Sequence, residues 1–354
     1  MDTTRYDVVI VGGGAAGLSA ATTLSRALRS VLVIDSGTPR NAPAAGVHGY
    51  LSRDGMTPGA LLSIGRSELL SYGGTVIDGE AVSARRTPDG FEVILGDARR
   101  FSGRRLLVTT GLTDELPPID GLREQWGKGV VHCPYCHGWE IRGQQIGVLG
   151  TGPLSVHQAL LFRQWSRDIT LFLNDTVEPT DEEWDKLAAR SVTVVDGAVA
   201  SVDAVDAVLT GLTLRQGTSF AVQALAVGTR MEARSALLES LGLSAQVHPS
   251  GAGRFIETDA MGGATAVRGV YAAGNVSNLM AQVITAAAEG VMSGARINAD
   301  LIEEETRWAV EGRFGPFSAA SEAAVSSIVL GHRRHGLDDG PNAAGMGPSA
   351  PRES

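Results

Sequence analysis

The chain opens with two short apolar runs separated by a glycine-rich segment and a helix-like segment. Residues 6–11 are mostly apolar, glycines follow, residues 18–29 have a helical composition, and residues 31–34 are apolar again. Short apolar runs that flank a helical segment are typical of parallel strands joined by a crossover helix. The start of the chain therefore predicts one β-α-β unit.

The same pattern returns in the second third of the chain. Residues 146–149 predict a strand, residues 150–155 a turn, residues 156–165 a helix, and residues 169–173 the next strand. Two such units in one chain indicate two Rossmann-like domains rather than one. Between the units we expect further strands at residues 75–84, 90–95 and 106–109, with a turn at residues 87–90.

The remaining pattern predicts how the two domains are connected. A proline-containing segment at residues 112–122 predicts a first crossing, and a second crossing is expected near residues 243–250. Residues 269–273 then predict a strand, and residues 282–298 predict a helix of small residues. We therefore expect an α/β fold with the second domain inserted in the first: residues 1–115 and 246–305 form the first domain, residues 116–245 the second, and residues 306–354 an extension.

The extension differs in composition from the rest of the chain. Residues 317–330 predict one more helix, whereas residues 338–354 are dominated by Pro, Gly, Ser and Ala. A segment of that kind buries too little apolar surface to offset the entropy of ordering it. We expect disorder at this end.

Composition and charge narrow the function classes. The chain has 354 residues, 43% of them apolar, and a formal net charge of -9. An acidic chain without a basic stripe is not expected to bind nucleic acid or an anionic membrane. No signal peptide precedes the first apolar run, and glycines interrupt the longest uncharged stretch, residues 8–24, so no membrane span is expected. We place the protein in the cytoplasm.

The first glycine motif has the features of a dinucleotide site. Gly12 permits the tight turn, Gly14 lets a pyrophosphate approach the backbone, and Gly17 lets the helix pack against the sheet. The helix N-terminus faces the anion. Asp35 ends the next strand, where a carboxylate binds ribose hydroxyls and repels a 2′-phosphate.

The second glycine motif, Gly150-x-Gly152-x-x-Ser155, is less suited to a nucleotide. Pro153 removes a backbone donor where a phosphate would be held. The following strand ends in residues 173–175, which include no Arg or Lys that could bind a 2′-phosphate. NADPH binding is therefore doubtful, while NADH stays open because an Asp in this segment can take a ribose hydroxyl.

The two cysteines of the chain stand three residues apart, in Cys133-Pro134-Tyr135-Cys136-His137. A cytosolic pair at this spacing favours redox chemistry over a structural disulfide, although an inert buried pair is the alternative. His137 or His132 can manage protons for such a pair. Zinc needs about four ligands in a tetrahedron, and adjacent residues are badly placed for that, so we expect no metal.

Together these residues resemble low-molecular-weight thioredoxin reductases over about residues 5–305. Within that superfamily the chain is most similar to the dithiol oxidases of disulfide natural-product biosynthesis, of the gliotoxin and holomycin type. Four segments carry the likeness: Pro39-Arg40-Asn41, His48-Gly49-Tyr50-Leu51, Cys133-Pro134-Tyr135-Cys136-His137-Gly138 and Ala272-Ala273-Gly274-Asn275.

The resemblance implies bound FAD, a homodimer and a division of labour between the cysteines. Cys136 is expected to face the flavin and Cys133 to exchange with the substrate, while His137 and His132 are the candidate bases. The resemblance and the glycine motif together assign the following residues to FAD binding: Gly12, Gly14, Ala15, Ala16, Gly17, Asp35, Ser36, Arg40, Asn41, His48, Val82, Thr110, Gly111, Gly274, Asn275, Gln282 and Val283.

Departures from the thioredoxin reductases point to the direction of the reaction. Those enzymes carry an acid where His137 stands, an Asp where Asn275 stands, and an Arg-Gln pair where this chain has Ala281-Gln282. Their His-Arg-Arg clamp for NADPH has no counterpart here. These differences favour an oxidase over a reductase.

We therefore expect an FAD-dependent dithiol oxidase that closes a disulfide in a small molecule and passes the electrons to O2, giving H2O2. The alternatives are an NAD(P)H-dependent disulfide reductase and a redox-sensing or partner-binding flavoprotein without turnover. Dithiolopyrrolones, epidithiodiketopiperazines and dithiol depsipeptides all fit the chemistry, in antibiotic biosynthesis or self-resistance.

Overall fold

The computed structural model describes residues 5–313 and 319–330. The chain divides into two compact units, Met1–Ile297 and Asn298–Ser354. The first unit contains two Rossmann-like lobes, and among the described residues no helix is long and apolar enough to cross a membrane.

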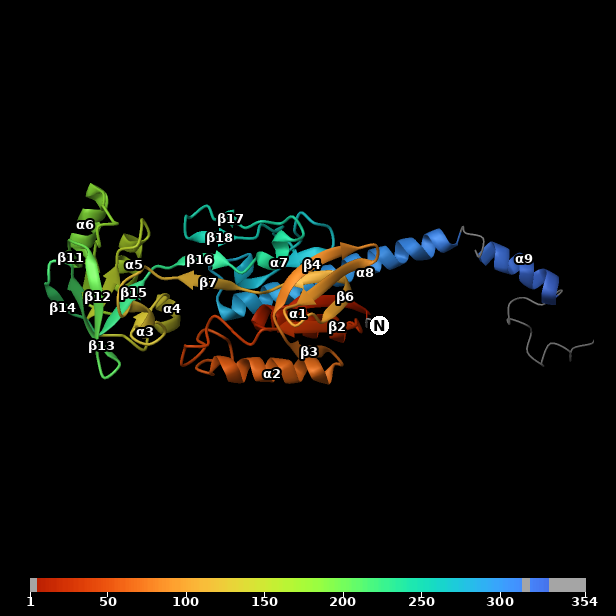
Figure 1. Cartoon of the computed structure of the whole chain (residues 1–354), viewed down its shortest axis with the longest axis horizontal. Coiled ribbons are helices and arrows are strands. Elements are labelled where there is room, and N and C mark those ends of the chain that lie inside the picture. Colours follow the sequence, from red (N-terminus) through yellow and green to blue (C-terminus); the bar gives the residue numbers. More distant parts are fainter. Residues whose placement is uncertain (1–4, 314–318, 331–354) are drawn as a thin grey trace, which may run out of the picture. The chain divides into compact units, whose positions relative to one another are not determined.

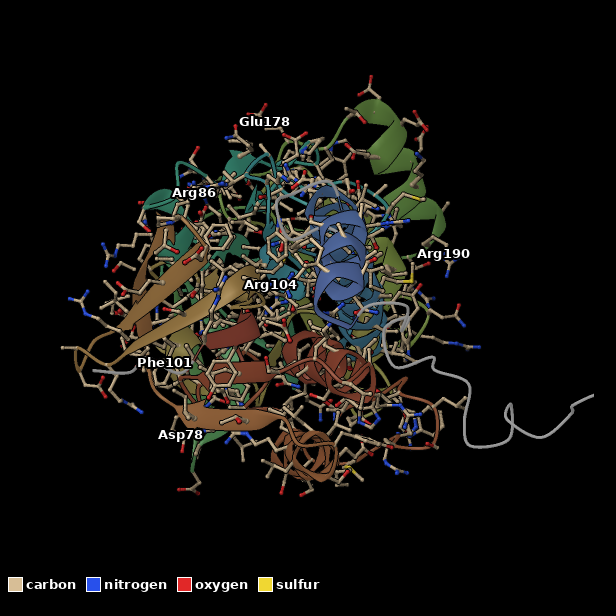
Figure 2. The ribbon with its side chains drawn as sticks, turned by 90° about the vertical axis from the view of Figure 1, so that its right-hand side faces the viewer. Asp78, Arg86, Phe101, Arg104, Glu178 and Arg190 are labelled. Carbon is tan, nitrogen blue, oxygen red and sulfur yellow. The ribbon has the colours of Figure 1, made fainter. Side chains whose placement is uncertain are left out.

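The first lobe is built on a mixed sheet whose centre is parallel (Figure 1). Apolar residues of β1 and β2 pair in parallel, with Val8 opposite Val31, and are almost fully buried. Arg104 of β6 pairs with Asp7 of β1 at 2.9 Å, and both side chains are largely buried (Figure 2). The strands of this sheet are β1 (Arg5–Val11), β2 (Val31–Asp35), β3 (Thr75–Asp78), β4 (Ala81–Thr87), β5 (Gly90–Leu95), β6 (Arg100–Val108) and β19 (Val270–Ala272).

The strand expected at residues 75–84 is two strands. β3 runs parallel to β2, whereas β4 runs antiparallel to β5. The break lies at Gly79, whose backbone N–H donates to the carbonyl of Asp35 at 2.9 Å. A uniform apolar pattern does not reveal that the chain changes partner at this point.

The first lobe has one helix that was expected and one that was not. α1 (Ala15–Arg26) follows the first glycine turn and begins earlier than the expected residues 18–29. α2 (Pro58–Ser71) was not predicted; it is capped by Thr57, whose side chain accepts a hydrogen bond from the backbone N–H of Ala60. Such a cap, with proline in the first helical turn, is a strong helix start.

The second lobe has a fully parallel sheet beside a small antiparallel one. Its parallel strands are continuous apolar runs, as expected for strands covered on both faces. The parallel strands are β8 (Val130–Val131), β9 (Ile146–Leu149), β10 (Ile169–Phe172), β11 (Thr193–Val195) and β15 (Ala224–Val227). The antiparallel strands are β12 (Val199–Val205), β13 (Val208–Leu214) and β14 (Ser219–Ala221). The helices are α3 (Leu122–Gln125), α4 (Pro134–His137), α5 (Ser155–Phe162) and α6 (Asp181–Ala189).

The two crossings between the lobes lie side by side. β7 (Leu112–Glu115) leaves the first lobe and β16 (Arg230–Ala233) returns to it, and the two strands pair antiparallel (Figure 1). The return therefore lies earlier than residues 243–250, where we expected it. The reason is that Leu237 and Leu238 of α7 (Ala236–Glu239) already pack into the core of the first lobe.

The chain then completes the first lobe. β17 (Gln246–Val247) and β18 (Gly253–Phe255) extend the crossing sheet, and the short 3₁₀ helix η1 (Gly274–Val276) follows β19. A long helix, α8 (Val283–Gly312), comes next, longer than the expected residues 282–298. Small residues let it approach α1 closely, since a Cβ on Gly290 would stand 2.1 Å from the carbonyl oxygen of Ala16. The second unit holds the end of α8 and α9 (Ala319–Leu330), while the tail for which we expected disorder lies outside the described residues.

Candidate active site

One cavity of about 1140 Å³ brings together the first glycine turn and the cysteine pair. It is larger than the roughly 300–1,000 Å³ of pockets for drug-sized ligands, and so has room for an extended dinucleotide. Of the residues assigned from the sequence, these line it: Gly12, Gly14, Ala15, Ala16, Asp35, Ser36, Arg40, Asn41, His48, Thr110, Gly111, His132, Cys133, Cys136, His137, Gly274, Asn275, Gln282 and Val283.

Two assigned residues do not line the cavity. A Cβ on Gly17 would stand 1.9 Å from the carbonyl oxygen of Gly12, so this glycine serves the close helix packing predicted for it. Val82 is 47% exposed, and its neighbours Glu80 and Ala81 line the cavity instead. The Val82 side chain is turned away because β4 begins at Ala81 and alternate side chains of a strand point to opposite faces, and the assignment of Val82 to FAD binding stays a prediction.

The glycine turn fits the pyrophosphate of FAD. Gly12 has φ of +109° and a Cβ there would stand 2.4 Å from the carbonyl oxygen of Thr109, whereas a Cβ on Gly14 would point into open space. Gly14 caps α1 without a side-chain hydrogen bond. Because glycine has no side chain that could cap them, the first N–H groups of the helix can bind an anion.

The ribose end of the cavity has a carboxylate held from two sides. Asp35 accepts a hydrogen bond from the backbone N–H of Gly13 at 3.1 Å and forms an ion pair with Arg66 of α2. Arg66 also pairs with Asp78 at 3.2 Å. No sequence motif indicates the role of Arg66, because its partners Asp35 and Asp78 lie on neighbouring strands.

The flavin segment after β19 needs an amide rather than an acid. The side-chain NH2 of Asn275 donates to the carbonyls of Asn278 at 3.0 Å and Ala281 at 2.9 Å. A carboxylate cannot donate these bonds. Asn275 therefore stabilises its own loop, and its amide oxygen stays available as an acceptor.

The cysteines lie on one face of a short helical turn. Cys133 is the N-cap residue of α4, which begins at Pro134, and Cys136 and His137 follow at helical spacing. Tyr135 points the other way, is 63% exposed and makes an edge-on ring contact with Trp165. Both cysteines are free thiols in this structure.

The two thiols are not equivalent. A hydrogen bond from Cys136 lowers the pKa of Cys133 to about 7, together with backbone N–H groups of Cys136 and Tyr135 and against the effect of burial. The hydrogen bond to Cys133, then burial, raises the pKa of Cys136. Cys133 is therefore the thiolate, and hence the nucleophile, near neutral pH.

Both histidines are kept neutral by their surroundings. Burial lowers the pKa of His132 and of His137 below its ordinary value. His132 Nδ1 lies 3.2 Å from the carbonyl of Val227, which can only accept, so Nδ1 carries the hydrogen and Nε2 has the lone pair. His137 Nδ1 is buried without a hydrogen-bond partner among the described residues. Either ring can accept a proton from a thiol.

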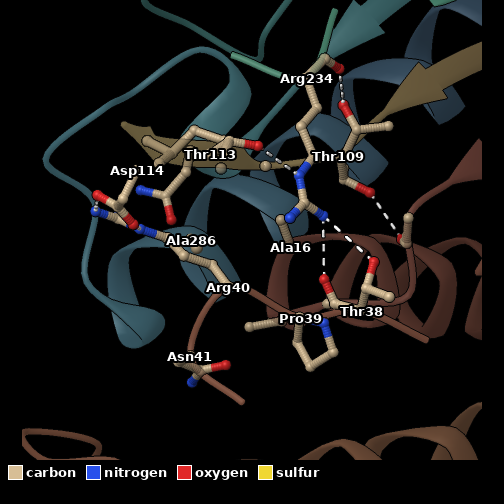
Figure 3. A pocket seen from close by; sticks show the side chains of 18 of the residues that line it. Ala16, Thr38, Pro39, Arg40, Asn41, Thr109, Thr113, Asp114, Arg234 and Ala286 are labelled. Carbon is tan, nitrogen blue, oxygen red and sulfur yellow. Dashed lines mark hydrogen bonds and ion pairs between the residues drawn. The ribbon is translucent and has the colours of Figure 1, made fainter. Parts of the chain in front are cut away.

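Two arginines reach the cavity from opposite directions (Figure 3). Arg40 donates to Asp114 of β7 through Nε at 2.6 Å and Nη2 at 2.7 Å. Arg234, which follows β16, donates to the backbone carbonyl of Thr38 at 3.0 Å and to Thr113 Oγ1 at 3.1 Å. Neither Asp114 nor Arg234 stands out in the sequence, because each lies in a crossing segment without a motif.

The second glycine turn is closed by its own side chains. Ser155 Oγ accepts the backbone N–H of Thr151 at 3.1 Å. Asn174, at the end of the next strand, donates to the carbonyl of Gly150 at 3.0 Å and accepts the N–H of Val199 at 2.9 Å. The N–H of Thr151 in this turn and the Asn174 side chain beside it are thus already paired.

Known proteins share this arrangement. Thioredoxin reductase tcpT of Claviceps purpurea (strain 20.1) is 31% identical to this chain, over 84% of the chain and 95% of its own length. The crystal structure of HlmI is 44% identical, with a TM-score of 0.81 over 86% of this chain and 95% of that one. An oxidoreductase from Agrobacterium tumefaciens is 35% identical, with a TM-score of 0.79 over 84% of this chain and 99% of that one.

The family follows from the same comparisons. A profile described as pyridine nucleotide-disulphide oxidoreductase matches residues 6–290. The predicted fold class and the resemblance to thioredoxin reductase-like proteins are confirmed. With its glycine turn and its cysteine pair opening into one cavity, the chain belongs to the pyridine nucleotide-disulphide oxidoreductase family.

Proposed function

We propose that this protein is an FAD-dependent dithiol oxidase that closes an intramolecular disulfide in a small molecule and uses O2 as the electron acceptor. One observation carries the proposal: the cysteine pair opens into the cavity of the first glycine turn, while the second turn is closed by Ser155 and Asn174. Electrons can thus reach a flavin from thiols more readily than from a pyridine nucleotide.

The chain's own groups account for the exchange of thiol and disulfide. His132 or His137 takes a proton from the first substrate thiol, and the thiolate attacks Cys133 of the oxidised pair. The Cys133–Cys136 bond breaks, a mixed disulfide forms, and Cys136 leaves as a thiolate. The second substrate thiol, deprotonated in turn, attacks the substrate sulfur of the mixed disulfide and releases Cys133. Two electrons and two protons have then passed from the substrate to the pair.

FAD, when bound, accepts those two electrons and two protons and transfers them to O2 as H2O2. The residues of this chain that would hold it are Gly12, Gly14 and Asp35 at the pyrophosphate and ribose, and Asn275 near the flavin chain. Cys133, with its pKa near 7, is suited to the exchange with substrate. Cys136, whose pKa is raised, takes up a proton once it has been displaced, so the reduced pair holds a thiol at Cys136.

A second candidate is an NAD(P)H-dependent disulfide reductase. It is favoured by the name thioredoxin reductase that the relative tcpT carries. The oxidase is preferred because the reductase requires a nucleotide at a turn where the N–H of Thr151 is bonded to Ser155 and Pro153 has no N–H to donate. As part of the proposal, we place the protein in the cytoplasm as a homodimer and assign its substrate to antibiotic biosynthesis or self-resistance.

The test is anaerobic reduction of the purified yellow protein. A small dithiol should bleach the visible flavin band, NADPH and NADH should not, and air should restore the colour and yield peroxide. Cys133→Ser should abolish the bleaching, whereas Tyr135→Phe, in the same motif but pointing away from the cavity, should not. Fast bleaching by either nucleotide, or full oxidase turnover by Cys133→Ser, would replace this function with another.

A further inference from the structure

Three segments of the chain meet at one buried carboxylate. Asp114 of β7 is only 7% exposed and binds Arg40, from the loop after β2, through two hydrogen bonds of 2.6 and 2.7 Å. Thr229, just before β16, donates its hydroxyl to the same carboxylate at 2.6 Å. Both crossings and the first lobe thus hold the Arg40 guanidinium in one orientation (Figure 3).

Stability alone does not explain this pair. Removing two charges from water costs about as much as their attraction returns, so a buried ion pair contributes little net stability. With Nε and Nη2 both bonded to one carboxylate, the guanidinium also keeps fewer donors for the cofactor to which Arg40 was assigned. The position of its charge is the more informative feature.

The charge and the redox pair face one cavity. Arg40, Asp114, His132, Cys133 and Cys136 all line it. His132 is the residue before Cys133, and its ring is bonded to Val227, two residues from Thr229. The network around Asp114 therefore borders the backbone segment that carries the cysteines.

The two histidines of the redox segment do not supply a positive charge at neutral pH. His132 and His137 are neutral because burial lowers their pKa values. The ring of His48 also lines the cavity, but it is paired with two carboxylates, Asp54 at 3.3 Å from Nδ1 and Glu140 at 3.6 Å from Nε2. The hydrogen bond from Cys136 is the largest cause that lowers the pKa of Cys133, and it acts against burial. The backbone donors and then the Arg40 charge lower this pKa further. The Arg40 charge also opposes the rise in the pKa of Cys136 that the bond to Cys133 and burial produce.

We propose that Arg40, oriented by Asp114, is the fixed positive charge that stabilises the thiolate of the reduced cysteine pair. Asp114 is then a positioning residue. Each exchange with substrate leaves the pair reduced, and a nearby cation keeps one sulfur as the reactive thiolate instead of letting it take a proton. This inference rests on the redox role proposed for the pair, but not on the identity of the electron acceptor.

The experiment measures the thiolate directly. Holoenzyme is reduced, freed of reductant under argon and alkylated with iodoacetamide across a pH series, and modification of Cys133 is followed by mass spectrometry. In Arg40→Gln the pH midpoint should rise by about one unit, which is roughly tenfold less thiolate below the midpoint. Arg40→Lys keeps the charge and should stay within about half a unit of the wild type.

Arg104→Gln is the matched control, because it removes an arginine from another largely buried pair, with Asp7 at 2.9 Å. Its midpoint should not move, whatever its melting temperature does. An unchanged midpoint in a folded, FAD-containing Arg40→Gln protein would overturn the proposal. If that variant fails to fold, a rise of a full unit in Arg40→Lys would overturn it equally. Neither result depends on oxidase turnover, so failure here is distinct from failure of the proposed function.

Discussion

The two lobes carry the same β-α-β turn, yet their side chains make opposite use of it. In the first lobe Gly14 opens into the cavity and Asp35 stands at the end of the next strand. In the second lobe the N–H of Thr151 is bonded to Ser155, and Leu173 stands at the register position that Asp35 has in the first lobe. Both lobes have the same backbone turn, but they differ in which hydrogen-bond donors and acceptors are free. Those free groups, rather than the fold, determine what each turn can bind.

The second lobe has a different task. Gln158 of α5, the helix after the closed turn, donates to the carbonyl of His132 at 3.0 Å. The end of β15 contributes Val227, whose carbonyl lies 3.2 Å from the ring of the same histidine. The elements that would bind a nucleotide thus hold the redox segment in place.

The largest expected effect comes from exchanging the last residue of the two glycine motifs, Gly17 in the first and Ser155 in the second. Gly17→Ser puts a side chain where a Cβ would stand 1.9 Å from the carbonyl oxygen of Gly12, so the first turn cannot keep its shape. We expect flavin content to fall below about a tenth of the wild-type value, measured by the visible absorbance of the purified protein.

The matched variant is Ser155→Gly, which makes the second motif resemble the first. It should leave the flavin content unchanged, because that turn is outside the cavity. If Gly17→Ser purified with full FAD, or if Ser155→Gly lost its FAD, the first turn would not be the one that binds the cofactor.

A smaller effect tests what the second lobe holds. His132→Ala should lower turnover with a small dithiol by about a hundredfold if this ring is the base, with flavin content unchanged. Because burial lowers its pKa, the wild-type ring is neutral at pH 7 and is lost as a base only as the pH falls through a value below 6.5. The ratio of wild-type to His132→Ala turnover, in which the titration of Cys133 near pH 7 cancels, should therefore be level from pH 8 to 6.5 and decline below, as followed by oxygen uptake. A decline that His137→Ala removes and His132→Ala keeps would assign the base to His137.

The motifs could be predicted from the sequence because each is local. The spacing of Gly12, Gly14 and Asp35 predicts the dinucleotide turn. The spacing of Cys133 and Cys136 predicts the redox pair. The fold class followed from two repeats of one hydrophobic pattern.

The contacts between segments could not be predicted. Arg40 and Asp114 are far apart in the chain, and Asp114 belongs to no motif, so only the fold brings them together. The break after β3 and the early return at β16 were missed for a related reason. An apolar stretch shows that residues such as Leu237 are buried, but not which core they join.

The smallest predicted effect compares one helix cap in each lobe. Thr180 and Glu183 form a reciprocal capping box at the start of α6, with N–H to oxygen distances of 2.9 and 3.3 Å, and Thr57 caps α2. Alanine at either cap should lower the free energy of unfolding by about 1 kcal/mol, measured by denaturant titration. Thr57→Ala should also weaken FAD binding severalfold, because α2 carries Arg66, the partner of Asp35. Thr180→Ala should leave FAD binding and turnover as they are. Weakened FAD binding in Thr180→Ala alone would mean that the second lobe helps to hold the cofactor. It would contradict the assignment of FAD binding to the first lobe.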